Sequence, residues 1–171
     1  ASGPIPNAID SDDFFITNPI EDRQPHISML YHWRPIKGAK TGISALNKIK
    51  DTNPNIKATI FSARKPYCTI PDWISLEIRP TIDRLREIYN SSSIFLHPSH
   101  LEGWPLTPAE SMMCGCVVVA SSNEGVQEYL THNETGLLSP IRDVDALIKN
   151  IQFLLENPRE RVRIAQMGHE K

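Results

Sequence analysis

The sequence has no long apolar run, little net charge and few cysteines, and each shortage disfavours a class of protein. Its longest compact apolar run, residues 116–120, is far shorter than the roughly 18 residues of a membrane-spanning helix. Lysine and arginine number 18 against 20 aspartates and glutamates, and this balance of −2 disfavours general nucleic-acid binding. Three cysteines are too few for a disulfide framework, so a reducing compartment, the cytoplasm, fits best.

Short apolar runs alternate with helical patterns from residue 27 onward. The apolar runs predict strands at 27–32, 57–62, 73–78, 93–97, 117–121 and 137–138. Apolar side chains at helical spacing predict helices at 40–52, 81–89, 108–114 and 143–156, with a further helix starting at Pro158. This alternation predicts an α/β fold, a single Rossmann-like doubly wound parallel sheet with helices on both faces. Residues 1–26, acidic and without long apolar periodicity, are interpreted as a lead-in segment to a domain at 27–171.

Ligands of such a sheet bind beyond the carboxyl ends of its strands. The loops expected on that edge are 33–40, 62–72, 99–107 and 121–126. The first loop carries Arg34 and Lys37, whose charges would attract a diphosphate. A solvated cationic face is the alternative, and it suits Lys48 and Lys50 better. Which of Arg34, Lys37 and Lys40 reaches a diphosphate stays open.

The third loop joins a strand to a short helix and holds two carboxylates. Thr107 followed by Pro108 is expected to open this helix, whose free N–H groups and dipole form a phosphate site. Glu102 and Glu110 would repel a phosphate but would accept hydrogen bonds from the hydroxyls of a sugar and a ribose. Glu110 alone, expected in the first turn, is also explained as a carboxylate stabilised by the helix dipole. Cations on one loop and hydroxyl acceptors on another indicate a nucleotide-sugar site.

Other patterns argue against cofactors and metals. The fingerprint G-x-G-x-x-G is absent after the first expected strand, which disfavours nicotinamide and flavin. No Asp-x-Asp lies on the binding edge, so fixed cations are expected to replace a metal. His97 and His100 are spaced like a metal pair, but His97 is expected to pack, and His100 to face the loops. Cys114 and Cys116 lack partner ligands and are expected to be buried apolar thiols.

Residues 93–119 resemble the E-x7-E region of retaining GT-B glycosyltransferases, in glycosyltransferase family four, also called glycosyl transferases group 1. In this region the matching residues are Pro98-Ser99, Glu102-Gly103, 109–112 and 114–118. Segments that agree in order elsewhere are Ile5 to Asp10 with Phe14, Arg34 with Lys37-Gly38, 125–128 and 135–138. The resemblance covers residues 4–168, almost the whole chain.

The resemblance implies a role for each candidate residue. The diphosphate would be bound by Arg34 and Lys37, the transferred sugar by Glu102 and the ribose by Glu110. Arg34, Lys37 and Glu102 would form the catalytic set. Residues implied to hold the sugar and phosphate, or to flank the base, are Gly103, Leu106, Thr107, Ser62 and Arg79. No metal site and no cofactor are implied, because the nucleotide-sugar is itself the donor substrate.

Enzymes of this family have two Rossmann-like domains, and the chain resembles the C-terminal, donor-binding half. The N-terminal acceptor domain and the final helices beyond Lys171 would be missing. The implied reaction transfers a sugar from a nucleotide-sugar to a glycan or polyprenyl-linked acceptor in surface polysaccharide synthesis. A UDP-sugar is the first candidate donor and a GDP-sugar the second. The transfer would take place at the cytoplasmic face of the membrane. The alternatives are a non-catalytic nucleotide-binding module and a phosphorylase or epimerase of related fold.

Overall fold

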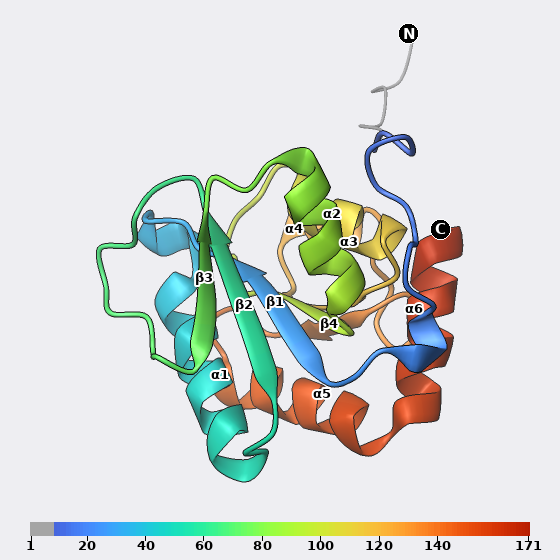
Figure 1. Ribbon diagram of the computed structural model, residues 1–171. Coiled ribbons are helices and arrows are strands. Elements are labelled where there is room, and N and C mark those ends of the chain that lie inside the picture. The colour runs from blue at the N-terminus through green and yellow to red at the C-terminus, as the bar shows by residue number, and fades with distance from the viewer. Residues whose placement is uncertain (1–8) are drawn as a thin grey trace, which may run out of the picture.

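Six parallel strands form one sheet in the computed structural model, which describes residues 9–171 (Figure 1). The strands are β1 (His26–Leu30), β2 (Lys57–Ser62), β3 (Ile74–Ile78), β4 (Ile94–His97), β5 (Val117–Ser121) and β6 (Leu137–Ser139). Their order across the sheet is β3-β2-β1-β4-β5-β6, the order of a doubly wound Rossmann-like sheet. The predicted fold class is confirmed. Every predicted strand forms, although the first ends two residues earlier than expected.

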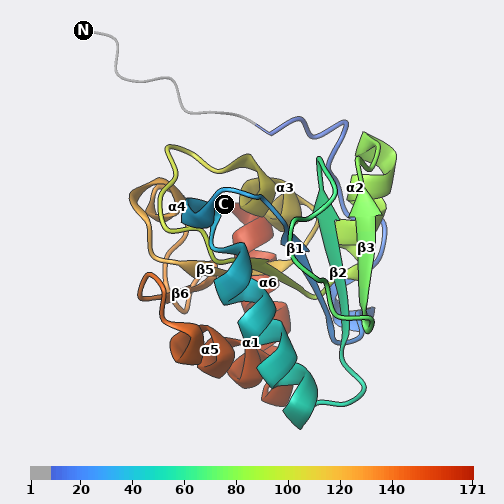
Figure 2. The ribbon, with the colours of Figure 1, turned by 90° about the vertical axis from the view of Figure 1, so that its left-hand side faces the viewer.

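Helices cover both faces of the sheet (Figure 2). They are α1 (Ala39–Thr52), α2 (Ile82–Ser91), α3 (Leu106–Met113), α4 (Glu124–Gln127), α5 (Val144–Glu156) and α6 (Pro158–Glu170). Two short 3-10 turns, η1 (Ile20–Asp22) and η2 (Pro35–Lys37), precede β1 and α1. The predicted cap of α5 is confirmed, since Asp143 accepts a hydrogen bond from the Ala146 N–H at 2.8 Å.

Each face of the sheet has its own apolar core. Alternate residues of a strand point to opposite faces, so Ile94 and Leu96 join the core under α1, α5 and α6. Phe95 joins the core under α2, α3 and α4. Cys114 and Cys116 are buried in this second core as free thiols, as predicted. Burial on both faces explains why the strands are nearly all apolar.

Helix α3 begins two residues earlier than the sequence predicts. Pro105 is the N-cap residue without a side-chain hydrogen bond, and Leu106 is the first helical residue. Thr107 is therefore not the cap, and Pro108 occupies the third position, where its missing N–H is not needed. Glu110 lies beyond the first turn, so the prediction that placed it there is wrong. The short helix α4 was not predicted; Asn123 caps it by accepting from the Val126 N–H at 3.0 Å.

Residues 9–25 pack against the domain. Phe14 and Ile20 are buried, one in each core. The Arg23 guanidinium is also buried and donates to the carbonyl oxygens of Asn18 at 2.8 Å and Cys114 at 2.6 Å. Residues 1–8 lie outside the described residues. They include the start of the predicted lead-in segment and the first residues of the segment from Ile5 to Asp10 that resembles the family. Among residues 9–171, no helix has the length and apolar character needed to cross a membrane.

Candidate functional site

The loops after β1 and β4 meet where the winding of the sheet reverses direction. β1 pairs with β4, and their chains leave the sheet toward opposite faces, to α1 and α3. Crevices at this switch point are the usual ligand sites of open α/β sheets. The backbones touch here, since the His100 N–H donates to the Ile36 carbonyl at 2.8 Å. Gly38 has φ +69°, and a Cβ at this position would overlap the Pro98 carbonyl oxygen.

Lys37 and Glu102 form an ion pair across this meeting point. Lys37 Nζ lies 2.5 Å from Glu102 Oε2, and the two side chains are 29% and 13% exposed. The other carboxylate oxygen, Oε1, lies 3.8 Å from His97 Nε2. Burial lowers the pKa of His97 to about 4, so His97 is neutral near pH 7 and Lys37 is the cation that balances Glu102. Two of the predicted catalytic residues are thus in direct contact.

Glu110 is held by a different neighbour. The Tyr89 hydroxyl donates to Glu110 Oε2 at 2.9 Å. Burial raises the pKa of the Glu110 carboxyl, and this hydrogen bond partly opposes the rise. Sequence reasoning missed Tyr89, because its spacing in the helix at 81–89 marks it as a core residue. Its ring is in fact core, and only the hydroxyl reaches the site.

The loop before α3 is fixed from the other side by the loop after β5. The Asn123 side-chain amide donates to the Ser99 carbonyl at 3.0 Å. A Cβ at Gly125 would overlap the Gly103 carbonyl oxygen, so these two backbones are in direct contact. A Cβ at Gly103 itself would meet nothing within 4 Å, and the next predicted residue, Leu106, is 50% exposed. The start of α3 is therefore open to a ligand.

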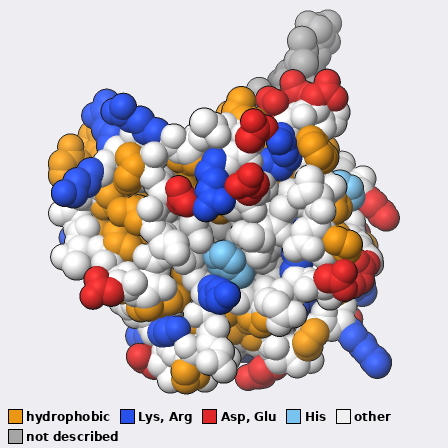
Figure 3. Space-filling view, in the orientation of Figure 1, with side chains coloured by type: hydrophobic (Ala, Val, Ile, Leu, Met, Phe, Trp, Pro, Cys, Tyr) orange, Lys and Arg blue, Asp and Glu red, His pale blue; other side chains and the backbone are white. Residues whose placement is uncertain are grey.

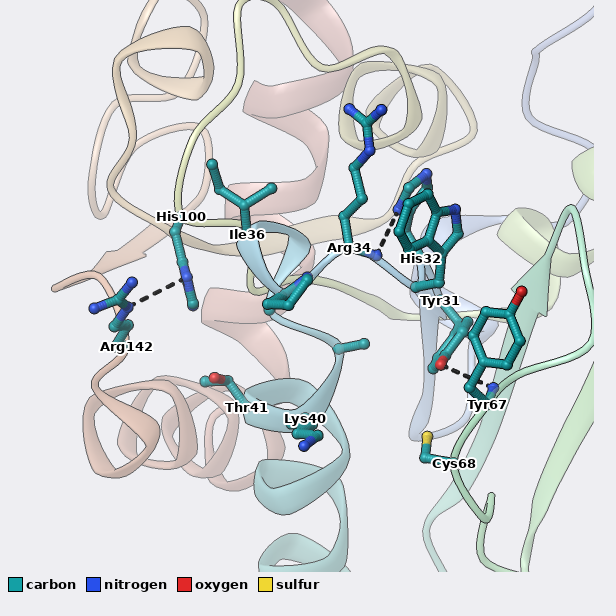
Figure 4. Close-up of a pocket in the computed structure, with 14 residues that line it drawn as sticks. Tyr31, His32, Arg34, Ile36, Lys40, Thr41, Tyr67, Cys68, His100 and Arg142 are labelled. Carbon is teal, nitrogen blue, oxygen red and sulfur yellow. Dashed lines mark hydrogen bonds between the residues drawn. The ribbon is translucent and has the colours of Figure 1, made fainter.

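Arg34 lines a cavity of about 690 Å³ whose lining includes neither Lys37 nor Glu102. Figure 4 shows its side chain extending away from α1, and its guanidinium lies 5.5 Å from the centre of the Trp33 ring. On the other side of the same view, the Arg142 Nε donates to His100 Nδ1 at 3.4 Å. Lys40 also lines this cavity, from the first turn of α1. Of the three candidate cations, Lys37 is the one that contacts Glu102.

Ser62 and Arg79 meet each other at the ends of β2 and β3. The Arg79 N–H donates to the Ser62 carbonyl at 2.8 Å, and its Nε donates to the Ala63 carbonyl at 3.2 Å. Arg79 has φ +51°, a left-handed conformation that non-glycine residues rarely adopt. β2 is the neighbour of β1, so this pair lies on the same edge of the sheet as Lys37.

Positive charge gathers at one part of this edge. Figure 3 shows Lys and Arg side chains at the upper left, over the loops that follow β1 and β2 in Figure 1. The second of these loops carries Arg64 and Lys65. Among residues 9–171, no group of three His, Cys, Asp or Glu side chains is arranged to hold a metal ion. The edge therefore combines cations and two separate carboxylates.

The chain is similar to several known glycosyltransferases. Residues 77–171 match the family described as glycosyl transferases group 1. The N,N'-diacetylbacillosaminyl-diphospho-undecaprenol alpha-1,3-N-acetylgalactosaminyltransferase of Campylobacter jejuni is 24% identical over 148 residues, 85% of this chain and 39% of that protein. A D-inositol 3-phosphate glycosyltransferase of Acidothermus cellulolyticus is 39% identical over 123 residues, 61% of this chain and 28% of that protein. The chain thus spans less than half the length of these curated relatives.

Solved structures share the fold along nearly the whole chain. A sucrose-phosphate synthase from Thermosynechococcus elongatus superposes with a TM-score of 0.84 at 23% identity, over 97% of this chain and 46% of that one. The C-terminal domain of a glycosyl transferase group 1 protein, LpcC, from Francisella tularensis gives 0.81 at 19% identity, over 95% of both chains. The sheet is therefore that of GT-B C-terminal domains. With more than half of its residues matched, the chain belongs to the glycosyl transferases group 1 family.

Proposed function

We propose that this chain is the donor-binding domain of a retaining, metal-independent glycosyltransferase. Its proposed donor is a UDP-sugar, with a GDP-sugar as the second candidate. The acceptor is a glycan or a polyprenyl-linked sugar, held mainly by an N-terminal domain of the longer protein. The observation that carries the proposal is the Lys37–Glu102 contact, which joins a cation and a carboxylate at the switch point of the sheet.

Lys37 would stabilise the leaving group. Breaking the bond between the anomeric carbon and the diphosphate oxygen builds negative charge on the diphosphate, and a fixed cation stabilises that charge where it develops. Lys37 is already placed at the switch point of the sheet, and Arg34 extends from the same loop. N–H groups of the first turn of α3, around Leu106 and Thr107, add donors for a phosphate oxygen. These cations and dipoles supply what a divalent metal supplies elsewhere, so the reaction is expected to proceed with EDTA present.

The two carboxylates would then bind hydroxyls. A diphosphate that attracts Lys37 competes with Glu102 for the ammonium group, and this competition frees Glu102 to accept from hydroxyls of the transferred sugar. Glu110, on α3, would accept from the ribose. The open space beside the Cα of Gly103 leaves room for the sugar. Ser62 and Arg79 would flank the base from the β2–β3 side.

Retention is proposed without a covalent intermediate on a carboxylate. Glu102 would be the nucleophile in a two-step reaction, but in the proposed complex its carboxylate accepts hydrogen bonds from hydroxyls of the transferred sugar, which leaves it poorly placed to attack the anomeric carbon. We therefore expect the acceptor to attack from the face that the leaving diphosphate occupies. A base for the acceptor hydroxyl would belong to the acceptor domain.

Names of relatives support the substrate classes. The Campylobacter jejuni relative is named for an undecaprenol diphosphate-linked acceptor. Structures of similar fold were solved with UDP-glucose, for Anabaena HepE, and with UDP, for TarM of Staphylococcus aureus. A polyprenyl-linked acceptor would place the longer protein at the cytoplasmic face of the membrane, in surface polysaccharide synthesis.

Calorimetric titration of the chain with UDP, GDP and ADP tests the proposal. We expect one of the three to bind, and expect Lys37→Ala, Arg34→Ala or Glu110→Ala to weaken its binding by about tenfold each. Lys48→Ala is the matched control, because Lys48 pairs with Asp145 at 3.1 Å on the exposed side of α1. Binding of none of the three nucleotides would refute a donor site. Binding without transfer by the longer protein would favour the non-catalytic module.

A further inference from the structure

Tyr89 has an apolar ring fixed on several sides and a polar end that reaches the site. The ring is fully buried near the end of α2. Three aromatic rings surround it, with centroid distances of 5.9 Å to Phe14, 5.8 Å to Phe61 and 5.7 Å to Phe95. These contacts leave the ring no other rotamer without repacking the core. The hydroxyl is therefore a fixed donor, and it meets Glu110 Oε2 at 2.9 Å.

A fixed donor on one oxygen determines where the other oxygen lies. The carboxyl of a half-exposed glutamate normally samples several rotamers, and binding a ligand through it then costs conformational entropy. The bond from Tyr89 selects one rotamer of Glu110 before any ligand arrives. It uses Oε2 and leaves Oε1 with its lone pairs for another donor.

The same bond favours the ionised form of the carboxyl. Burial raises the pKa of Glu110, whereas the hydrogen bond from Tyr89 lowers it. The ionised form accepts hydrogen bonds only, and it binds hydroxyl donors more strongly than a neutral acid does. Adjacent hydroxyls of a ribose are such donors, and a deoxyribose has one fewer.

We infer that Tyr89 is a positioning residue that makes the site select ribonucleotides over deoxyribonucleotides, by holding Glu110 in the rotamer that accepts from the ribose hydroxyls. The inference rests on the proposed function, in which Glu110 binds the ribose. Tyr89 itself touches no ligand. We expect Tyr89 to affect the ratio of the affinities for ribonucleotide and deoxynucleotide, and not to be required for nucleotide binding itself.

The test compares, in the full chain, dissociation constants for UDP and 2′-deoxy-UDP, or for the matching pair of the nucleotide that binds best. Wild type is expected to prefer the ribonucleotide by at least tenfold. Tyr89→Phe should weaken the ribonucleotide by about fivefold and the deoxynucleotide by clearly less, because the deoxynucleotide keeps only one of the two hydroxyls. Glu110→Ala should remove the preference, and the double variant should match Glu110→Ala. Tyr129→Phe is the matched control, since the Tyr129 hydroxyl donates to the Pro105 carbonyl at 2.9 Å and not to Glu110.

Several outcomes overturn the inference. If Glu110→Ala loses the preference but Tyr89→Phe keeps it, Tyr89 has no positioning role while the proposed function stands. Equal weakening of both nucleotides by Tyr89→Phe would show a purely structural role. If wild type binds neither nucleotide, the proposed function fails as well.

A second measurement serves if Tyr89→Phe does not fold. In wild-type chain labelled with ζ-¹³C-tyrosine, the ribonucleotide should shift the Tyr89 resonance more than the deoxynucleotide does. Equal shifts would also overturn the inference.

Discussion

Replacing Glu102 with glutamine should strengthen the binding of a bare nucleoside diphosphate. Lys37 is held by Glu102 in the unliganded chain, at 2.5 Å between Nζ and Oε2. A diphosphate that recruits Lys37 must compete with this carboxylate, so part of its binding free energy is spent on opening the pair. Glutamine keeps the size of the side chain but removes the charge, and it leaves Lys37 free to meet the diphosphate.

The size of the effect follows from the burial of the pair. Fully exposed ion pairs contribute up to about 1 kcal/mol, and breaking a buried pair costs about 3–5 kcal/mol. Side-chain exposures of 29% and 13% place this pair between the two cases. We expect about 1–2 kcal/mol, which corresponds to an affinity gain of about 5–30-fold.

Calorimetric titration with the nucleoside diphosphate and with the corresponding nucleotide-sugar measures the gain. The diphosphate should bind Glu102→Gln more tightly, while the nucleotide-sugar should gain less, since the variant lacks the carboxylate that we propose to bind the sugar. Glu124→Gln is a matched control that removes a carboxylate from the start of α4. Weaker diphosphate binding by Glu102→Gln would refute the competition between diphosphate and carboxylate.

Three further predictions concern the scaffold. Gly38→Ala should lower the free energy of unfolding in urea by about 2–4 kcal/mol, because Gly38 has φ +69° and an added Cβ would overlap a neighbouring carbonyl. Gly103→Ala is the control and should cost less than about 1 kcal/mol, because the space around an added Cβ is open there. Arg23→Ala removes a buried guanidinium that donates to several carbonyls, and it should lower the free energy of unfolding by about 3–5 kcal/mol. The control Arg84→Ala removes an exposed ion pair and should lower it by no more than about 1 kcal/mol. Similar losses for both variants would contradict the argument. The pKa of His97 is lowered to about 4 in the folded chain, so the unfolded chain binds the extra proton and stability should fall as the pH drops from about 6.5 toward 4. In His97→Gln this loss of stability between about pH 6.5 and pH 4 should disappear. If the urea midpoint of the variant depends on pH in the same way as that of wild type, the role of His97 is refuted.

The sequence predicts the sheet well because its strands are covered on both faces. Buried parallel strands read as short apolar runs, and the runs at 57–62 and 117–121 coincide with β2 and β5. The start of α3 was misplaced because Thr107 before Pro108 has the pattern of a cap and a first helical residue. Proline is equally acceptable at the third position, whose N–H has no partner within the helix. Helix α4 is too short to show an apolar period.

The site was predictable to the level of its loops and not of its side-chain contacts. Parallel pairing of β1 with β4 brings the loops of Lys37 and Glu102 to one point, as the topology implies. The choice between Arg34 and Lys37 depends on the turn η2, which directs the two side chains differently and has no signal in residue spacing. Tyr89 could not be found from the pattern, because its buried ring explains its spacing completely.

The contact at Gly125 limits how the crevice can respond to a ligand. Its Cα lies against the Gly103 carbonyl, and an added Cβ would come within 2.7 Å of the Glu102 carbonyl oxygen as well. The loop that bears Glu102 consequently cannot move toward α4 without displacing Gly125. Under the proposed function, sugars of different shape would therefore be accommodated by rotation of individual side chains on this loop, and exchanging a few of those residues is expected to change the donor preference.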